Sequence, residues 1–432
     1  LAEIRRVKPD APVLALTATA TRRVMDDIME RLQFREKKVF RMSFKRDNLA
    51  YVVREALDKY AELLHILKSV EGSAIIYTRS RRRSKVVSEW LEQQGVSATF
   101  YHAGLEPAIK DERQKLWQTD KKRVMAATNA FGMGIDKPNV RLVIHLDCPD
   151  SVEAYFQEAG RAGRDGKKAY AILLWNGHDH AVLAKRIKTT FPSKEIVRDV
   201  YDHLAYFFQV GLGSGNGHTF TFNIDQFCYI YHFYPLYVNS ALHILQSAGY
   251  IEYETDPDAR ARLRFLLGRD ELYKLYETTP NEEAVISALL RNYSGLFSDY
   301  RYVEEALISQ VSGLSQNEVY LILKSLSHTR ILHFIPQRKT PFITYTQDRI
   351  DGCDVVIPAS VYDQRKEQFI KHVNAIEAYA TNNHVCRSRQ LLRYFDETKS
   401  EDCGICDVCV DHQPNPNAEQ EFKDAKQAIL DL

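Results

Sequence analysis

Between residues 59 and 145 the chain alternates helical segments with apolar strands, and this alternation limits its fold more than any other feature. Helices are predicted at 59–69, 80–94 and 107–118, and strands at 73–77, 98–101 and 123–127. Strands separated by helices form a parallel sheet, because each crossover places a helix on a face of the sheet. Ligands of such sheets bind at the carboxyl ends of the strands. We therefore expect an α/β lobe with functional residues along one edge.

A pair of arginines follows this alternating region. Arg161 and Arg164 stand three residues apart in a segment predicted to be helical, and that spacing puts both guanidinium groups on one helical face. Two guanidinium forks aimed in one direction suit the spread negative charge of a transferring phosphoryl group. The alternative is a solvated basic helix end. The Thr- and Gly-rich turn at 128–136 favours a functional role, because glycine lets the backbone approach a ligand closely.

Five motifs occur along this part of the chain in one order. They are ALTATAT at 15–21, AIIYTRSR at 74–81, FYHAGL at 100–105, ATNAFGMGIDKPNVRLVIH at 127–145 and YFQEAGRAGRDG at 155–166. Together they resemble the later helicase motifs of the RecQ-type DNA helicases of superfamily 2. The resemblance implies that residues 1–44 end a first RecA-like lobe and that 45–190 form the second. Asp47 departs from the family, which usually has proline there, and this affects only the stiffness of the hinge.

The resemblance implies a nucleotide site for this chain. It makes Arg164 the arginine finger, Arg161 a second contact to the γ-phosphate or between lobes, and Gln157 a nucleotide sensor. It places Gly134 and Asp136 at the nucleotide cleft. ATP and Mg²⁺ would be the ligands of the complete helicase.

The resemblance also implies contacts to DNA, in single-stranded, forked or junction form. The DNA backbone would be bound by Thr78, Arg79, His102 and Thr128. Hydroxyls and arginines bind phosphates without reading the base sequence. The alternatives are that Thr78 caps its helix and that His102 is a structural histidine.

The sequence holds no GxxxxGK[ST] phosphate loop and no DEAH-type metal-binding box. Those elements supply the lysine for the β- and γ-phosphates and the carboxylate for Mg²⁺. We therefore expect this chain to be a helicase fragment that binds DNA and zinc but does not hydrolyse ATP alone.

Residues 195–350 depart from the commonest RecQ layout, in which the zinc module follows the second lobe almost directly. They contain a weak repeat, with 237–253 parallel to 318–334. Each copy predicts an amphipathic helix, a turn and a strand, with a further strand at 262–267 in the first copy and 342–345 in the second. This order predicts winged-helix-like modules at 195–270 and 281–350.

In such a module the second helix enters the DNA groove. The polar candidates of copy two are Gln316, Asn317, Lys324, His328 and Arg330. Copy one offers few cations on its helix. The alternative is that both modules are spacers between proteins.

Four cysteines near the end of the chain, Cys386, Cys403, Cys406 and Cys409, predict a metal site. Four thiolates with no further ligand nearby fit a closed, tetrahedral Zn²⁺ site, which is structural because no position is left for water. An iron–sulfur cluster is the rival. The surrounding sequence resembles the RecQ zinc-binding subdomain, here 361–412, followed by a linker and short helix at 413–432.

The composition is ordinary for a globular protein of several domains. An odd total of 7 cysteines with one tight cluster argues against a disulfide framework and for a reducing compartment, so we expect the cytoplasm, either bacterial-type cytosol or nucleoid. No apolar run approaches the roughly 18 residues of a membrane span. The net charge of +1 hides a basic run at 79–85, so DNA binding would be regional.

The sequence thus predicts a RecA-like parallel-sheet lobe, mostly α winged-helix-like modules and a helical zinc-binding subdomain. The predicted function is the C-terminal part of an ATP-dependent 3′ to 5′ DNA helicase that acts in replication, recombination or repair. One alternative is a non-catalytic DNA-binding protein of winged helices and zinc, against which the complete set of later motifs argues. Another is an RNA helicase of related fold, which the AFGMGIDKPNVR motif and the zinc module disfavour.

Overall fold

The computed structural model describes residues 8, 11–17, 19–132, 135–255, 261–268, 271, 279–336 and 341–412. The chain divides into two compact units, Leu1–Ile187 with Arg365–Leu432 and Lys188–Gln364. Within the described ranges, no helix has the length and apolar character needed to span a membrane.

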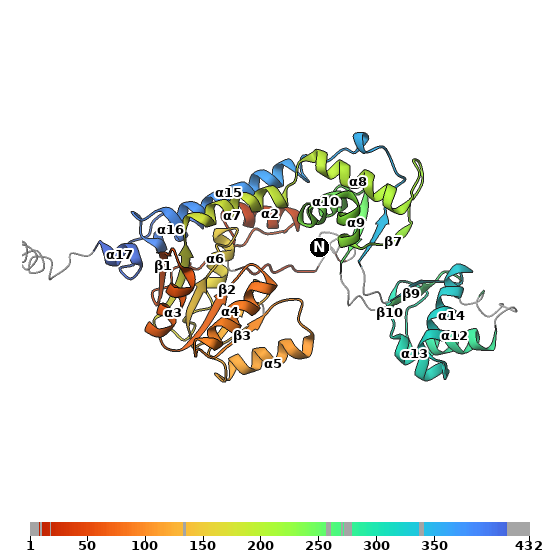
Figure 1. Ribbon diagram of the computed structural model, residues 1–432, viewed down its shortest axis with the longest axis horizontal. Coiled ribbons are helices and arrows are strands. Elements are labelled where there is room, and N and C mark those ends of the chain that lie inside the picture. Colours follow the sequence, from red (N-terminus) through yellow and green to blue (C-terminus); the bar gives the residue numbers. More distant parts are fainter. Residues whose placement is uncertain are drawn as a thin grey trace, which may run out of the picture. The chain divides into compact units, whose positions relative to one another are not determined.

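The first unit is built on a six-stranded sheet whose neighbouring strands are all parallel (Figure 1). Its order is β1-β6-β5-β2-β4-β3. The strands are β1 (Leu49–Glu55), β2 (Ser73–Tyr77), β3 (Ala98–Tyr101), β4 (Val124–Ala127), β5 (Val140–His145) and β6 (Ala169–Trp175). The helices are α3 (Lys59–Ser69), α4 (Arg81–Gln93), α5 (Pro107–Gln118), α6 (Val152–Ala159) and α7 (Gly177–Thr190). The predicted parallel α/β lobe is confirmed.

Both faces of this sheet are buried. In β2, Ile75 points into one apolar cluster and Ile76 into the other, as the two-residue period of a strand requires. Helices α15 (Asp363–Thr381) and α16 (Arg387–Tyr394) add Ile376 and Leu391 to the first cluster. The two helices on either side of Cys386 in the sequence therefore pack on one face of the lobe.

The segment before the sheet forms a helix, α2 (Arg22–Arg31), capped by Thr21, whose Oγ1 accepts from the Val24 amide at 3.5 Å. The apolar stretches at 13–16 and 38–41, which sequence pattern alone would predict to be strands, form no strand. A strand needs neighbours for its backbone hydrogen bonds, and in the described part of the chain none lies beside these residues. Leu16 and Phe40 are 84% and 94% exposed.

In its described residues the second unit contains two modules, each with three helices and a three-stranded antiparallel sheet. The split module has α8 (Lys194–Phe208), α9 (Ile224–Tyr231) and α10 (Pro235–Ser247), with β7 (Thr219–Thr221), β8 (Ile251–Glu254) and β12 (Phe342–Tyr345) in the order β7-β12-β8. The inserted module has α12 (Pro280–Asn292), α13 (Glu305–Ser312) and α14 (Gln316–His328), with β9 (Arg262–Phe265), β10 (Arg301–Tyr302) and β11 (Leu332–Ile335) in the order β10-β9-β11. A 3-10 turn, Gly352–Asp354, follows β12.

Each module contains the strand that the sequence predicted for the other module, and this strand exchange corrects the predicted modules. The sequence assigned 262–267 to the first copy and 342–345 to the second, but β8 pairs with β12 and β9 pairs with β11. In the sequence, the inserted module therefore lies between β8 and β12, which are neighbouring strands of the split module's sheet. Each predicted strand exists, but a short apolar strand does not specify which sheet it joins, because pairing depends on packing with residues distant in sequence.

Each module has its own core, which explains the exchange. Ile343 of β12 packs in the cluster that contains Leu242 of α10. Leu263 of β9 packs with Leu332 of β11 in the other cluster. All four side chains are fully buried, so each strand contributes to the core of the sheet that it joins.

Candidate functional site

The arginine pair lies in a turn after α6, which corrects the predicted helical placement. Ser151 caps α6 by accepting from the Ala154 amide at 3.1 Å, and the helix ends at Ala159. Gly163 has φ +63°, a left-handed conformation that glycine adopts without strain. Its backbone therefore bends the chain between Arg161 and Arg164, and a helical face does not align them.

Both arginines nevertheless reach the same loop, at 132–136. Arg161, 8% exposed, donates from Nη1 to the Gly132 carbonyl, while its buried Nε has no hydrogen-bond partner among the described residues. Arg164 donates from Nη1 to the Ile135 carbonyl at 2.8 Å and lies 3.2 Å from the Asp136 carboxylate. The expected convergence of Arg161, Arg164 and Asp136 is therefore present, whereas Gly134 lies outside the described residues.

The arginines line a cleft of about 910 Å³. Gln157 lines the same cleft, as do Thr17 and Thr19 of the ALTATAT motif. Motifs far apart in the sequence thus meet at one concave site. Arg46 supports the site by donating from Nη2 to the carbonyls of Ala162 and Gly163 at 3.0 Å.

The residues expected to contact DNA share one edge of the sheet. Thr78, Thr128 and His102 follow β2, β4 and β3, which are neighbours in that order. The Thr78 amide donates to the Ala127 carbonyl at 2.8 Å, and the Thr128 amide to the Tyr101 carbonyl at 3.2 Å. The alternative that Thr78 caps its helix is wrong, because the cap of α4 is Ser80.

Arg79 is held by acidic neighbours at this edge. Its guanidinium pairs with the Asp150 carboxylate, and its amide donates to Asp147 Oδ2 at 2.9 Å. Burial lowers the pKa of the Arg79 guanidinium. A phosphate bound by Arg79 would have to compete with Asp150, a competition that the sequence did not indicate.

His102 lies among cations. Its Nδ1 is buried without a hydrogen-bond partner in the described part of the chain, and its ring stacks on Phe100 with centroids 5.7 Å apart. Burial lowers the pKa of His102, and the charges of Arg81, Arg113 and Lys110 lower it further. The imidazole is therefore neutral near pH 7, in a positive field that attracts phosphate.

Sequence reasoning missed a buried polar pair below this edge. His145, at the end of β5, lies with Nε2 2.9 Å from Glu158 Oε2 on α6, and its ring stacks on Tyr77. The pair ties the strand to the helix that precedes the arginines. The sequence feature that could have indicated this pair is the histidine at the end of the mostly apolar strand VRLVIH, residues 140–145.

The four predicted cysteines come together. The sulfurs of Cys386, Cys403, Cys406 and Cys409 all lie within 4.8 Å of one another. A tetrahedral zinc with Zn–S bonds of about 2.3 Å places its sulfurs roughly 3.8 Å apart, and Cys386 and Cys406 are 3.9 Å apart. The amides of Cys403 and Cys409 donate to cysteine sulfurs at 3.2 and 3.4 Å, which stabilises thiolates. The donor set and spacing fit a structural zinc ion.

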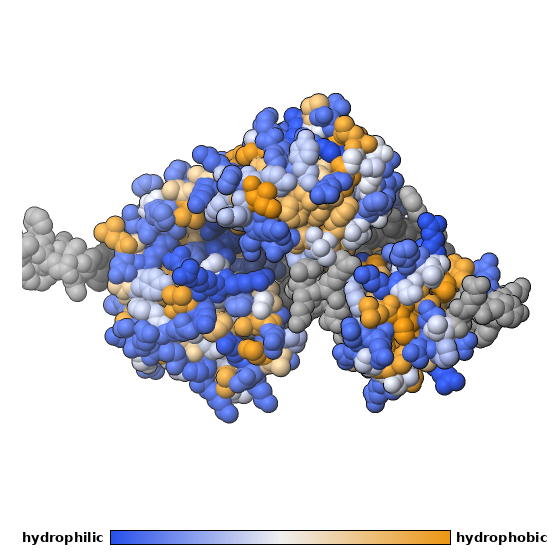
Figure 2. Space-filling view, turned by 45° about the vertical axis from the view of Figure 1, so that its right-hand side comes forward, coloured by the Kyte–Doolittle hydropathy of each residue, from blue (hydrophilic) through white to orange (hydrophobic). Residues whose placement is uncertain are grey.

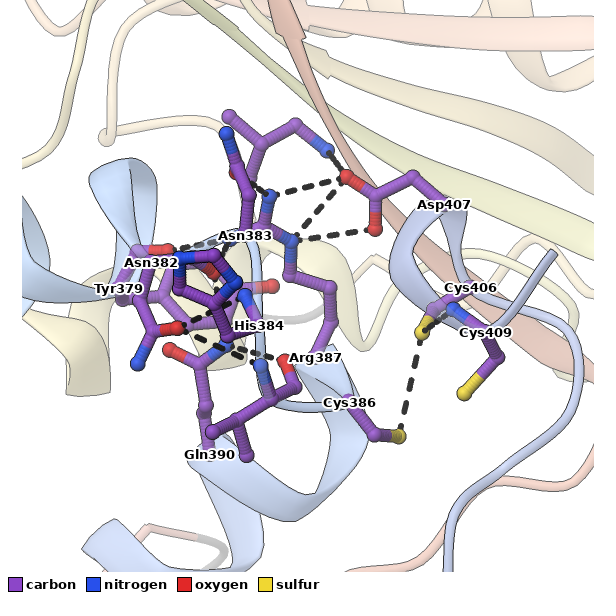
Figure 3. A network of polar contacts seen from close by, with 12 residues as sticks. Tyr379, Asn382, Asn383, His384, Cys386, Arg387, Gln390, Cys406, Asp407 and Cys409 are labelled. Atoms are coloured by element: carbon purple, nitrogen blue, oxygen red, sulfur yellow. Dashed lines mark hydrogen bonds and ion pairs between the residues drawn. The ribbon is translucent and has the colours of Figure 1, made fainter. Parts of the chain in front are cut away.

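A buried arginine anchors this cluster to the lobe (Figure 3). Arg387, 1% exposed, donates from Nε to both carboxylate oxygens of Asp407 at 3.1 Å. Its Nη1 donates to the carbonyls of Tyr379 and Asn382. Asp407, which begins α17 (Asp407–Asp411), also accepts from the Val53 amide of β1 at 3.0 Å. The cysteine cluster, α15 and the sheet are therefore joined by one network of hydrogen bonds. The spacing of the cysteines does not reveal this network.

Three family models match separate parts of the chain. The helicase conserved C-terminal domain matches residues 57–166, the RecQ helicase winged-helix domain of Bacteroidota matches 263–336, and the RecQ zinc-binding domain matches 346–410. The second match covers the inserted module almost to the residue. The third covers the four cysteines.

Known proteins resemble part of this chain. The chain is 42% identical over 191 residues to the ATP-dependent DNA helicase RecQ of Haemophilus influenzae, covering 44% of this chain and 31% of that protein. It is 42% identical over 183 residues to the RecQ-like DNA helicase blm-1 of Caenorhabditis elegans, covering 42% of this chain and 18% of that protein. The solved structure of S. cerevisiae Dbp5 bound to RNA and ADP BeF3 aligns at 20% identity and a TM-score of 0.37, covering 43% of this chain and 51% of the other.

The chain spans less than a third of either curated relative. The motif resemblance is nonetheless confirmed by independent matches to the lobe, a winged-helix module and the zinc module. This chain therefore resembles the C-terminal helicase, winged-helix and zinc-binding parts of the RecQ-type DNA helicases.

Proposed function

We propose that this chain is the C-terminal part of an ATP-dependent DNA helicase that translocates 3′ to 5′ and unwinds duplexes in replication, recombination or repair. The observation that carries the proposal is the convergence of Arg161, Arg164 and Gln157 on one cleft beside the loop at 132–136. Arginines directed at one site stabilise the charge of a transferring phosphoryl group.

The two arginines have different roles in this proposal. Arg164 is about one-third exposed, and its partner Asp136 is 87% exposed, so solvent screens their ion pair. A γ-phosphate can replace that carboxylate, which makes Arg164 the arginine finger. Arg161 is buried and bound to the Gly132 carbonyl, so its role is to position the loop.

The carboxyl edge of the sheet holds the DNA backbone. The hydroxyls of Thr78 and Thr128 and the positive surroundings of His102 suit phosphates, and Arg79 would bind a phosphate after its guanidinium leaves Asp150. Because the arginine turn and this edge belong to one sheet, nucleotide-dependent movement of the lobe shifts its grip on one strand.

ATP hydrolysis would need a phosphate loop and a carboxylate that binds magnesium. This sequence has no GxxxxGK[ST] loop and no DEAH-type box to supply them. The decisive experiment joins residues 45–432 to a RecQ-type first lobe that has both elements. The chimaera should hydrolyse ATP with single-stranded DNA, and Arg164→Ala should reduce turnover by about a thousandfold or more, as loss of an arginine finger does. Unchanged turnover in Arg164→Ala would remove this residue from the mechanism.

DNA binding can be tested on the chain itself. Affinities for a forked DNA, a single strand and an RNA duplex should be compared at one salt concentration, because phosphate contacts make affinity salt-dependent. The proposal expects the fork and the DNA strand to bind more tightly than the RNA duplex. Tighter binding of the RNA duplex would favour an RNA helicase instead.

A further inference from the structure

The sheet of the inserted module has one face in its core and one face outside it. Leu263 and Phe265 of β9 are buried in the core, so the alternate residues Arg262 and Arg264 point to the opposite face. Strand register places Tyr302 beside Arg262 and His333 beside Arg264. Arg264, Tyr302 and His333 are exposed, Tyr302 by 61%.

These side chains form an ordered cationic and aromatic surface. Tyr300, just before β10, lies with its ring centroid 5.2 Å from the Arg264 guanidinium and 5.9 Å from that of Arg262. The Tyr300 hydroxyl hydrogen-bonds His333 Nδ1. Among the described residues Glu254 is a carboxylate that reaches the group, 3.3 Å from Arg262, and both side chains are one-third exposed. Arginine over a tyrosine ring is a cation–π arrangement that presets both groups for a ligand.

The helical side of the module is less suited to a polyanion. Lys324 is the one lysine or arginine of α14, and its side chain is exposed. The apolar side chain of Leu321 is exposed on the same helix. Val311 of α13 is exposed as well. Hydrophobic patches are visible on this module, at the right of Figure 2. Density of positive charge therefore favours the sheet face over the helix that sequence reasoning singled out.

We propose that the outer face of the β10-β9-β11 sheet binds single-stranded DNA. Bases stack on Tyr302 and Tyr300, and Arg262 and Arg264 pair with phosphates. Flat aromatic side chains flanked by arginines are what sequence-tolerant single-strand binding requires, because every base has a face that can stack. This surface is separate from the lobe, so the chain would hold DNA at a second place.

The split module supplies a matched control. Its sheet has the same strand order, and β12 occupies the central position that β9 has in the inserted module. Register places Thr344 where Arg264 stands, Thr221 where Tyr302 stands and Glu252 where His333 stands. That face offers carboxylates and hydroxyls, so it should repel DNA.

The first test measures binding of the full chain to a fluorescent oligothymidylate of about 16 nucleotides at about 50 mM salt. Arg264→Thr with Tyr302→Thr installs the residues of the split module and should weaken binding about tenfold, the effect of losing one base stack. The control, Glu252→Gln with Thr221→Ala, should keep wild-type affinity. Thermal unfolding checks that both variants remain folded. Wild-type affinity in the first variant would overturn the proposal.

The second test locates the contact. An oligothymidylate bearing 5-iodouracil should crosslink to Tyr300 or Tyr302, identified by peptide mass spectrometry. An abasic oligomer of equal length should bind more weakly than the thymidylate, and Tyr302→Thr should reduce that difference. Crosslinks confined to lobe peptides would overturn the proposal and leave the face to an acidic protein partner. Because Arg79→Ala tests the lobe alone, failure of the proposed function is distinguishable from failure of this inference.

Discussion

The split and inserted modules share an architecture but present opposite chemistry. In the part of the chain that the structure describes, both have three helices and a three-stranded sheet with equivalent strand order. The outer face of the inserted sheet has two arginines, two tyrosines and a histidine, whereas that of the split sheet has Glu252, Glu254, Thr219, Thr221, Phe342 and Thr344. The difference teaches that the fold sets where side chains stand and that residue identity decides what the surface binds.

The topology also explains how one module can interrupt another. Arg262 pairs with Ile335 at one edge of the inserted module, and Glu254 pairs with Phe342 in the split module. The ends of the insertion are thus neighbours, and so are the strand ends that receive it. A domain whose ends lie together can be inserted with little disturbance of its host.

The largest effect is expected from a core substitution that separates the modules. Leu263→Ala should destabilise the inserted module by about 3 kcal/mol, because the side chain is fully buried and leaves a cavity. Hydrogen exchange followed by mass spectrometry should accelerate in α12–α14 and not in β8 or α10. Ile343→Ala, equally buried in β12, should give the reverse pattern. Faster exchange of β8 in Leu263→Ala would restore the pairing predicted from sequence.

Excision of the inserted module should leave its host folded. Replacing residues 255–341 by Asn-Gly joins Glu254 directly to its register partner Phe342 through a two-residue hairpin turn. The shortened chain should unfold cooperatively with intact helical circular dichroism, and it should bind oligothymidylate about tenfold more weakly, by loss of the sheet face. A shortened chain that aggregates would mean that the two modules depend on each other. Excision with unchanged affinity would place all DNA binding elsewhere.

The sequence predicted what depends on local pattern. Helix periodicity located α3 and α5 to the residue, and cysteine spacing located all four members of the metal cluster. It failed where the outcome depends on distant residues. The strand exchange, the Arg387–Asp407 anchor and the Arg79–Asp150 pair each join segments that no periodicity relates. The arginine pair was placed on a helix because Gly163 was not recognised as the residue that turns the chain.

A smaller effect is expected when the cations of the inserted module's outer face are placed on the outer face of the split module. Thr344→Arg with Glu252→His gives the split face the cations of its counterpart and should strengthen oligothymidylate binding about threefold at low salt, through added phosphate contacts. The control, Thr344→Ala with Glu252→Gln, removes the same groups without adding cations. If both variants bind equally, repulsion by Glu252 and not missing cations distinguishes the faces.

The smallest expected effect is a pH dependence confined to the inserted face. Burial lowers the pKa of His333, and the charges of Arg264 and Arg262, which face it from β9, lower it further, while Tyr300 hydrogen-bonds its ring. The free protein therefore has a neutral His333 near pH 7. A bound phosphate raises this pKa, so DNA binding takes up a proton, and affinity rises as pH falls from about 7 toward 5.5. The gain is limited to about tenfold for each unit by which DNA raises the pKa.

This pH effect separates the two modules because the split sheet has Glu252, and not a histidine, at the position of His333. His102 of the lobe also has a lowered pKa, so the wild-type profile contains a contribution from each histidine. His333→Gln removes only the inserted module's part and should flatten the profile measured by fluorescence anisotropy at constant salt. A profile unchanged by His333→Gln would show that no phosphate approaches this histidine, and DNA would then lie nearer Tyr302 than β11.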